Sequence, residues 1–206
     1  MTTVFHYVRH ASHGHLGHIL TGRLYGIGIT VQGRMEADIL AGEMAAHPIE
    51  AIFTSPRLRA RQTAAHLSEA TGAAVAINRN LDEIDFGGWQ GHTFADLERE
   101  PAWREWNCNR DTAATPAGAT MAEVADRQME LLERLRTRYS GKTICLVSHG
   151  DVIKAVICRL RGLPFQAVHD FELAPASITT IAFEAHGASV AVPRKRALPI
   201  LQEAVG

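Results

Sequence analysis

The sequence contains few cysteines, almost no net charge and no long apolar run, and each absence argues against a class of protein. The three cysteines (Cys108, Cys145 and Cys158) show no CxxC spacing and no disulfide pattern, which favours a reducing compartment. The formal net charge is -1, so nucleic acid is not expected as a partner. No stretch reaches the roughly 18 consecutive apolar residues of a membrane span, and no apolar signal-peptide region precedes the first strand. We therefore expect a cytoplasmic protein that binds neither nucleic acid nor membranes.

The chain has enough apolar residues to form one complete core. Hydrophobic residues make up 46% of the 206 residues, which fits a single domain over residues 1–206. The irregular stretch around 81–118 holds all three tryptophans, and it is predicted to form short helices that cap the sheet as an insertion. The sequence does not fix the oligomeric state, and it allows a homodimer.

Short apolar runs separated by helical patterns indicate an α/β fold. The runs predict strands over residues 3–9, 51–54, 74–78 and 143–147, and a terminal hairpin of 177–183 and 188–192 that turns at His186-Gly187. Strands that alternate with helices favour a mainly parallel sheet. We therefore expect a three-layer α/β/α sandwich with a small helical cap.

Capping signals and apolar spacing place the helices. Thr30 is the predicted N-cap of a helix that runs to about residue 46, with Val31, Met35 and Ile39 spaced on one face. Further helices are predicted from Pro56 through Leu67 with Gly72 as terminator, from the capping box of Thr120 and Glu123 to Tyr139, and over residues 151–161.

One short pattern occurs at the ends of two distant strands. Val8-Arg9-His10-Ala11 ends the first apolar run, and Val147-Ser148-His149-Gly150 ends the run at 144–147. Ligands bind at the carboxyl ends of parallel strands, so both histidines are expected at one edge of the sheet. Gly150 lets a ligand approach the backbone, and the helix that follows favours an anion at its N-terminus. The pattern therefore predicts an anion-binding site and points to an enzyme.

Histidine and arginine at such an edge suit phosphoryl transfer. A neutral imidazole is a competent nucleophile near pH 7 and can accept a phosphoryl group. The planar guanidinium of arginine binds two phosphate oxygens at once. Arg9 stands beside His10, and Arg57, Arg59 and Arg61 follow the second strand, although at most two of these three can face the site. The sequence thus supplies a nucleophile and cations for the phosphate.

The reaction also needs an acid that protonates the leaving oxygen. Asp82, Glu83 and Asp85 lie in an apolar, glycine-rich segment where partial burial raises the pKa of a carboxyl group. The residues by themselves do not separate these three candidates.

The chain carries four motifs in order: RHA at 9–11, SPRLRARQTA at 55–64, LDEIDFGGWQG at 81–91 and VSHG at 147–150. Together they resemble the histidine phosphatase superfamily, which includes the phosphoglycerate mutase-like enzymes. The resemblance implies that His10 is the phosphorylated nucleophile and that Glu83 is the proton donor. It implies that Arg9, Arg59 and His149 form the phosphate pocket, with Ser55 as a neighbour of that pocket. It also implies a reaction that needs no metal and no cofactor.

The loop at residues 11–29 departs from the family pattern, and substrate selectivity is expected to lie there. The mutase branch carries a Trp-Asn pair after its first motif, and this chain carries a Gly- and His-rich stretch instead, which favours hydrolysis. Ser12 and Arg23 are predicted to contact the substrate, with Arg23 facing a second anionic group. His13, His15 and His18 have the spacing of metal ligands, but the glycines between them argue against a preorganised metal site.

The expected function is the hydrolysis of a small phosphorylated metabolite through a phosphohistidine intermediate. Two alternatives stay open: a phosphoglycerate mutase-like phosphotransferase or isomerase, and a catalytically silent module that binds a phosphorylated ligand. Because an idle site has no need for an acid, the carboxyl candidates speak against the silent module. The sequence does not identify the physiological substrate. Near the end of the chain, Arg194-Lys195-Arg196 is expected to be a solvated turn.

Overall fold

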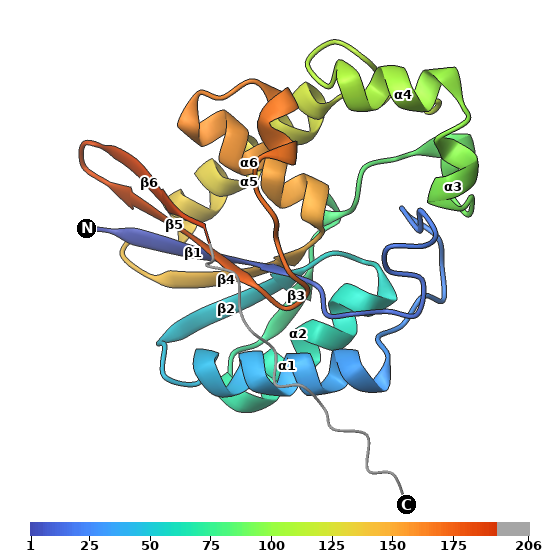
Figure 1. Ribbon diagram of the computed structural model, residues 1–206. Helices are drawn as coiled ribbons and strands as arrows, with labels where there is room; N and C mark the ends of the chain where they lie inside the picture. The colour runs from blue at the N-terminus through green and yellow to red at the C-terminus, as the bar shows by residue number, and fades with distance from the viewer. Residues whose placement is uncertain (193–206) are drawn as a thin grey trace, which may run out of the picture.

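Within residues 1–192, six strands form one sheet at the centre of the molecule (Figure 1). The computed structural model describes residues 1–192, so Arg194-Lys195-Arg196 lies outside the described residues. The strand order is β3-β2-β4-β1-β5-β6, with parallel pairing from β3 to β1 and antiparallel pairing from β1 to β6. The strands are β1 (Thr3–Arg9), β2 (Ile49–Thr54), β3 (Val75–Ile77), β4 (Thr143–Ser148), β5 (Ile178–Glu184) and β6 (Gly187–Ala191). The expected mainly parallel sheet is confirmed.

The strand register brings distant parts of the chain to one edge of the sheet. β1 and β4 are parallel neighbours, and Arg9 pairs with Ser148. His10 and His149 are therefore the next residues beyond the two strands. On the other side of β4, the register continues from Thr54 opposite Val147, so the segment after β2 emerges at the same edge.

Alternating side chains of the central strands face two separate cores. Phe5 and Tyr7 of β1 belong to the core under α5 (Met121–Arg138) and α6 (Gly150–Arg161). Val8 belongs to the core under α1 (Val31–Met44) and α2 (Leu58–Thr71). Figure 1 shows the two helix pairs on opposite faces of the sheet. The three-layer α/β/α sandwich is confirmed.

The face that the sequence indicated for the first helix is not the buried one. Val31, Met35 and Ile39 lie on an exposed face, and Val31 has 66% of its surface exposed. The buried face carries a series of small residues together with a few larger ones: Gly33, Glu36, Ala37, Leu40, Ala41 and Met44. A Cβ at position 33 would overlap the carbonyl oxygen of Ser12. The close backbone contact at Gly33, together with the burial of Leu40 and Met44, favours this face.

Most helix ends follow their capping signals. The Thr30 hydroxyl accepts from the amide of Gly33 at 3.0 Å, and Thr120 and Glu123 form the expected capping box. Gly72 ends α2 in the left-handed conformation, with φ of 73°. The start of α2 was expected at Pro56, but the helix begins at Leu58 because Arg57 is still extended. The final hairpin turns at residues 185–186, one residue earlier than expected.

Residues 82–118 form a helical layer over one end of the sandwich, shown in green in Figure 1. This segment holds α3 (Phe94–Leu97), α4 (Pro101–Cys108) and a short 3-10 turn (Gly87–Trp89). Trp89 and Trp103 pack edge to face with ring centroids 5.2 Å apart, and Trp106 is fully buried. Across residues 1–192, none of the helices has the length and apolar character needed to cross a bilayer.

Candidate active site

His10 directly follows β1, and the backbone fixes the orientation of its ring. Nδ1 lies 2.9 Å from the carbonyl oxygen of Ala11, and because a carbonyl only accepts, Nδ1 carries the proton. Nε2 therefore holds the lone pair, and it accepts a hydrogen bond from Nε of Arg59 at 3.2 Å. Burial, followed by Arg59 and Arg9, holds the pKa of His10 well below its ordinary value of 6.5. The imidazole is neutral, which is the state that a nucleophile requires.

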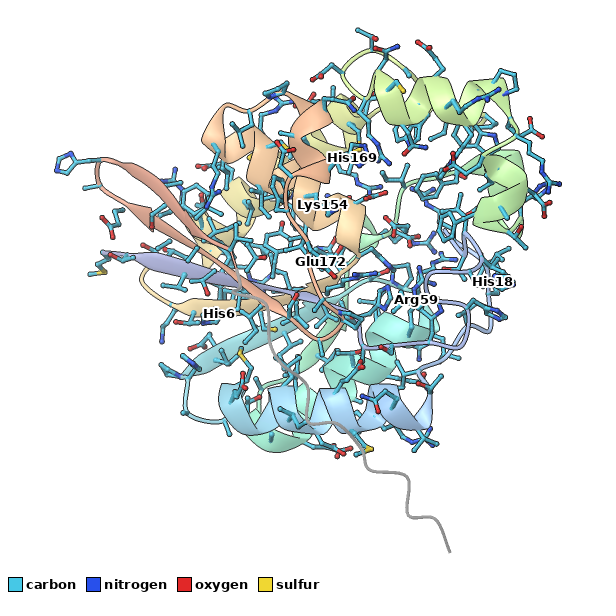
Figure 2. All side chains as sticks on the ribbon, in the orientation of Figure 1. His6, His18, Arg59, Lys154, His169 and Glu172 are labelled. Atoms are coloured by element: carbon cyan, nitrogen blue, oxygen red, sulfur yellow. The ribbon has the colours of Figure 1, made fainter. Side chains whose placement is uncertain are left out.

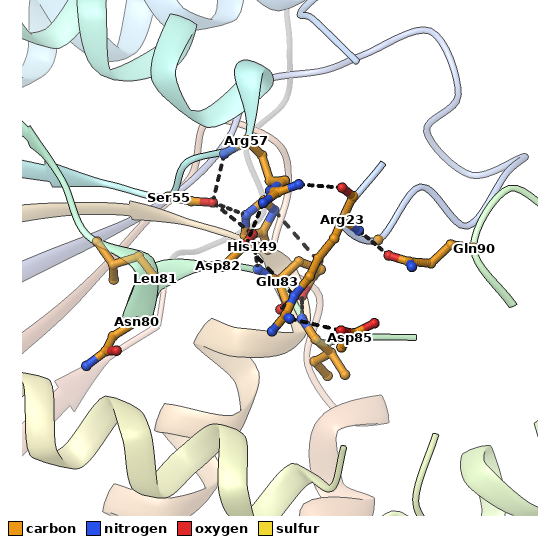
Figure 3. A network of polar contacts seen from close by, with 12 residues as sticks. Arg23, Ser55, Arg57, Asn80, Leu81, Asp82, Glu83, Asp85, Gln90 and His149 are labelled. Atoms are coloured by element: carbon orange, nitrogen blue, oxygen red, sulfur yellow. Dashed lines mark hydrogen bonds and ion pairs between the residues drawn. The ribbon is translucent and has the colours of Figure 1, made fainter. Parts of the chain in front are cut away.

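His149 precedes α6 and lies beside His10, with ring centroids 5.2 Å apart. Nη2 of Arg59 donates to its Nδ1 at 3.1 Å, so Nε2 carries the proton and donates to Oγ of Ser55 at 2.7 Å. Oγ of Ser55 in turn donates to Asp82 at 3.4 Å (Figure 3). Burial and then Arg59 lower the pKa of His149 well below 6.5. Groups from three segments thus fix this ring.

Arg59 lies between the two histidines. It is the second residue of α2, it is 1% exposed, and its Nη2 also donates to the carbonyl of Gly22 at 2.7 Å. Its Nη1 is buried and has no hydrogen-bond partner within residues 1–192. Figure 2 shows Arg59 at the end of the sheet, near the 11–29 loop. A buried cationic donor of this kind favours an anionic partner.

Arg9 supplies a second buried cation. It is the last residue of β1, and its Nη1 donates to the carbonyl of Leu173. Its Nε has no partner in the described part of the chain. Gly150 packs against this guanidinium, since a Cβ at position 150 would lie 3.4 Å from Nε of Arg9. Arg9 and Arg59 therefore both offer free donors near His10.

Ion pairs separate the three candidate acids. Asp82 pairs with Arg57 at 2.9 Å, and Asp85 pairs with Arg23 at 3.0 Å (Figure 3). Among the described residues Glu83 has no ion pair with arginine or lysine, and its Oε2 lies 3.7 Å from Nδ1 of His149. Burial and then Asp151 raise the pKa of Glu83 to about 7, although Arg59 opposes the shift. Glu83 therefore lies beside the histidines with a pKa that suits proton transfer near neutral pH.

Two predicted substrate contacts have partners within the protein. The hydroxyl and the amide of Ser12 both donate to the carboxylate of Glu36, each at 2.8 Å. Arg23 donates from Nε to the carbonyl of Glu83 at 2.9 Å, and its charge is paired with Asp85. Ser12 thus attaches the loop to α1, and Arg23 attaches the loop to the segment that carries the acid. In this structure both residues hold neighbouring segments in place.

The three loop histidines do not gather around one point. His13 is buried beside His10, with ring centroids 5.3 Å apart, and burial followed by Arg59 lowers its pKa to about 4. The rings of His13 and His15 are 6.4 Å apart, and His18, labelled in Figure 2, is exposed. Within the residues that the structure describes, no three His, Cys, Asp or Glu side chains are arranged to hold a metal ion.

The contribution of α5 was not foreseen from the sequence. Arg127 donates to the carbonyl of Asp82, and Gln128 donates to the carbonyl of Asn80. Gln128 also accepts from the hydroxyl of Tyr7 at 2.9 Å and is fully buried. A polar residue within the apolar face of α5 was the available signal. These bonds fix the segment that precedes Glu83.

Comparison with known proteins identifies the family of this chain. The model of the histidine phosphatase superfamily (branch 1) matches residues 5–194. The chain belongs to this superfamily. An acid phosphatase of Mycobacterium tuberculosis is 33% identical over 184 residues, or 85% of either chain. Phosphoserine phosphatase 1 of Hydrogenobacter thermophilus is 29% identical and matches 76% of this histidine phosphatase and 75% of its own length.

Solved structures show the same fold. The phosphoserine phosphatase of Entamoeba histolytica in complex with 3-phosphoglyceric acid superposes with a TM-score of 0.84 and 28% identity. The match covers 94% of this histidine phosphatase and 98% of that chain. The phosphoserine complex of a mutant of the Entamoeba enzyme superposes with a TM-score of 0.82 and 28% identity, over 91% of this chain and 94% of that one.

Proposed function

We propose that this chain is a phosphomonoesterase that hydrolyses a small phosphorylated metabolite through a phosphohistidine on His10. The observation that carries the proposal is the state of His10. Its Nδ1 is committed to the carbonyl of Ala11, which leaves the lone pair on Nε2, and the buried donors of Arg9 and Arg59 lie around it. Membership of the histidine phosphatase superfamily supports the same chemistry.

In the first step, Nε2 of His10 attacks the phosphorus atom. The bond between nitrogen and phosphorus forms as the bond between phosphorus and the ester oxygen breaks. Glu83 gives its proton to the departing oxygen, so the alcohol leaves neutral. A carboxyl group with a pKa near 7 suits this role, because it is protonated at neutral pH and still releases its proton readily.

In the second step, water releases the phosphate. Glu83, now a carboxylate, takes a proton from water, and the oxygen attacks phosphorus while the bond to Nε2 breaks. Free phosphate leaves, and His10 regains its lone pair. Arg9 and Arg59 hold the phosphoryl oxygens through both steps, with His149 and Gly150 beside them. Catalysis of this kind depends mainly on positioning and on charge stabilisation.

The same proposal covers the domain organisation, the compartment and the first substrates to test. Residues 1–206 act as one catalytic unit, and the segment at 81–118 covers the substrate. The three free cysteines support a reducing cytoplasm. The names of the relatives, phosphoserine phosphatase and acid phosphatase, make phosphoserine and a generic aryl phosphate the first substrates to test.

Phosphoenzyme trapping and product analysis test the proposal together. Brief incubation of the wild-type protein with 32P-labelled phosphoserine or acetyl phosphate, followed by alkaline quenching, should leave acid-labile phosphate on the protein. Turnover of p-nitrophenyl phosphate should yield equal amounts of nitrophenol and inorganic phosphate. His10→Ala should lose both signals. The matched control is His186→Ala, because His186 is an exposed histidine in the turn before β6.

The outcomes also decide between the open alternatives. Substantial turnover in His10→Ala contradicts the assigned nucleophile. A labelled phosphoprotein that transfers phosphate to a second hydroxyl without releasing it indicates a mutase. Binding of phosphoserine by the wild-type protein without any labelling or turnover indicates a silent binding module.

A further inference from the structure

A third buried histidine lies beside the two that end β1 and β4. His13 is 6% exposed, and its ring centroid is 5.3 Å from that of His10. It stands in the loop three residues after the nucleophile, and the proposed two-step reaction gives it no role. Because buried polar groups are normally hydrogen-bonded, the state of each nitrogen of this ring indicates what it can bind.

The backbone of the loop fixes both the position and the tautomer of His13. The residue forms an isolated antiparallel bridge with Ile29, and its carbonyl accepts from the amide of Leu16 at 3.1 Å. The amide of His15 donates to Nδ1 of His13 at 3.3 Å, so Nδ1 holds the lone pair. The proton of the neutral ring is therefore on Nε2. This N–H group has no hydrogen-bond partner among residues 1–192.

The three neighbouring imidazoles differ in which nitrogen is free. His10 uses Nδ1 to bind a backbone carbonyl and keeps the lone pair on Nε2 for attack. His149 has both nitrogens engaged, because Arg59 donates to its Nδ1 and its Nε2 donates to Ser55. Of these three rings, within the described part of the chain, only that of His13 has an N–H group without a protein partner.

The charges around His13 favour an anion as the partner of this donor. Burial, followed by the charges of Arg59, His15 and Arg9, lowers the pKa of His13 to about 4, so the ring is neutral at pH 7 and lies near both guanidinium groups. Each of the two arginines has a buried nitrogen without a partner within residues 1–192. A neutral N–H group adds a hydrogen bond to an anion at this place without burying a third positive charge.

We propose that His13 is a further ligand of the phosphoryl group and that its Nε2–H group donates a hydrogen bond to a non-bridging oxygen. The proposal rests on the proposed phosphatase function, because it assigns His13 to the same phosphoryl group. No bond to His13 forms or breaks in either step. His10 remains the nucleophile, and Glu83 remains the acid. The hydrogen bond exists with bound phosphate as well as with substrate, so it can be measured without turnover.

A series of substitutions at position 13 separates the donor from the volume of the ring. Isothermal titration calorimetry of the full chain at pH 7 measures the binding of inorganic phosphate and of orthovanadate. His13→Leu keeps an apolar side chain but removes the donor, so both anions should bind about tenfold more weakly. His13→Gln places an amide N–H group near the position of Nε2 and should recover the wild-type affinity to within about threefold. The value of kcat/KM for p-nitrophenyl phosphate should follow the same order.

His18→Leu is the matched control, because His18 is an exposed histidine of the same loop, and it should bind both anions like the wild type. Wild-type affinity in His13→Leu overturns the proposal, and so does a His13→Gln variant that binds no better than His13→Leu. A wild-type protein that binds neither anion at millimolar concentration overturns it as well. If the wild type binds phosphate but forms no phosphohistidine, the proposed function fails, whereas the order of affinities still decides the role of His13.

Discussion

The two helical layers pack on the same sheet with different kinds of side chain. Small residues fill much of the buried face of the α1 and α2 layer: Gly33, Ala37, Ala41, Ala60 and Ala64. Large aliphatic residues dominate the α5 and α6 layer: Leu131, Leu132, Leu135, Ile153 and Ile157. A large side chain buries more apolar area and stabilises more, whereas a small one lets backbones approach. The first layer therefore brings backbones close together at several points, whereas the helices of the second layer bury more large aliphatic side chains.

The layer of small residues is the one that holds the loop after His10. The amide of Ala11 donates to Oγ1 of Thr63 on α2 at 3.0 Å, and Gly33 of α1 lies against the carbonyl of Ser12. Arg59 enters the site from the same layer. The α5 and α6 layer contributes Gly150. It also contributes Arg127, which donates a hydrogen bond to the carbonyl of Asp82, next to Glu83. Close packing and catalytic placement thus coincide on one side of the sheet.

Replacing Arg59 should have the largest effect and would show that α2 supplies the site. Arg59→Met keeps a similar volume but removes the guanidinium, so kcat/KM should fall by about a thousandfold. Steady-state hydrolysis of p-nitrophenyl phosphate measures the loss. Arg61→Met, on the exposed face of the same helix, should keep wild-type turnover. Equal activity of the two variants would mean that α2 does not supply a phosphate ligand.

Glu83→Gln probes the acid, which comes from neither layer. Loss of the proton donor should lower kcat by about a hundredfold or more for a poor leaving group. In the wild-type enzyme, kcat/KM should decline as the pH rises through about 7, because Glu83 then loses the proton that it must donate. The neutral state of His10 should keep the acid side flat to well below pH 6.5. The decline above pH 7 should be absent from the pH profile of Glu83→Gln.

The same variant has a stability signature of defined sign. The pKa of Glu83 rises from 4.5 to about 7 on folding, so the folded state binds the proton more tightly. Stability is therefore lost as the pH rises from about 4.5 to about 7. Glu83→Gln removes this cost and should be more stable than the wild type at pH 8, by on the order of 1 kcal/mol. The control is Asp85→Asn, which should show no such gain because the carboxylate of Asp85 is paired with Arg23 in the wild type.

Leu135→Ala tests the assignment of stability to the second layer. Leu135 is buried on α5, two turns beyond Arg127, and its truncation should cost about 2–4 kcal/mol of unfolding free energy. Urea denaturation measures the loss, and kcat/KM of the folded enzyme should stay unchanged. Leu163→Ala, at an exposed leucine, should cost little. A parallel loss of activity would show that this layer also sets the geometry of the site.

Gly33→Ala tests the first layer with a single methyl group. The new Cβ overlaps the carbonyl oxygen of Ser12, so the loop after His10 must shift. We expect a loss of about 1–3 kcal/mol in stability together with lower kcat/KM. Gly42→Ala is the matched control on the same helix, since nothing lies within 4 Å of its Cβ, and it should raise stability by about 0.5–1 kcal/mol.

The parts of the fold that follow from local patterns could be predicted. Apolar runs marked the strands, and the cap residues Thr30, Thr120 and Gly72 marked helix ends. The meeting of His10 and His149 also followed, because parallel strands in one sheet end at one edge. These features depend on short-range rules or on topology alone.

Features that depend on tertiary partners could not be predicted. Glu83 differs from Asp82 and Asp85 through its burial near Asp151 and through the arginines that pair with the two aspartates. These neighbours come from other segments of the chain. The spacing of large apolar residues indicated one face of α1, and this face is exposed. The opposite face is buried, and there Gly33 lies close to the backbone of Ser12. The contact between Ser12 and Glu36 could not be predicted either, because Glu36 lies on α1, 24 residues farther along the chain.

The adjacency of β1 and β4 has a consequence for how activity appears during synthesis and refolding. β1 belongs to the first residues of the chain, and its parallel partner is made only after the cap and α5. Joining such remote segments closes a large loop, which is an intrinsically slow and late event. Nascent or truncated chains that stop before β4 therefore lack the pocket, whatever helices they have formed. Catalytic turnover should therefore appear only after β1 and β4 have paired. After dilution from urea, the recovery of activity should lag behind the recovery of the helical circular dichroism signal.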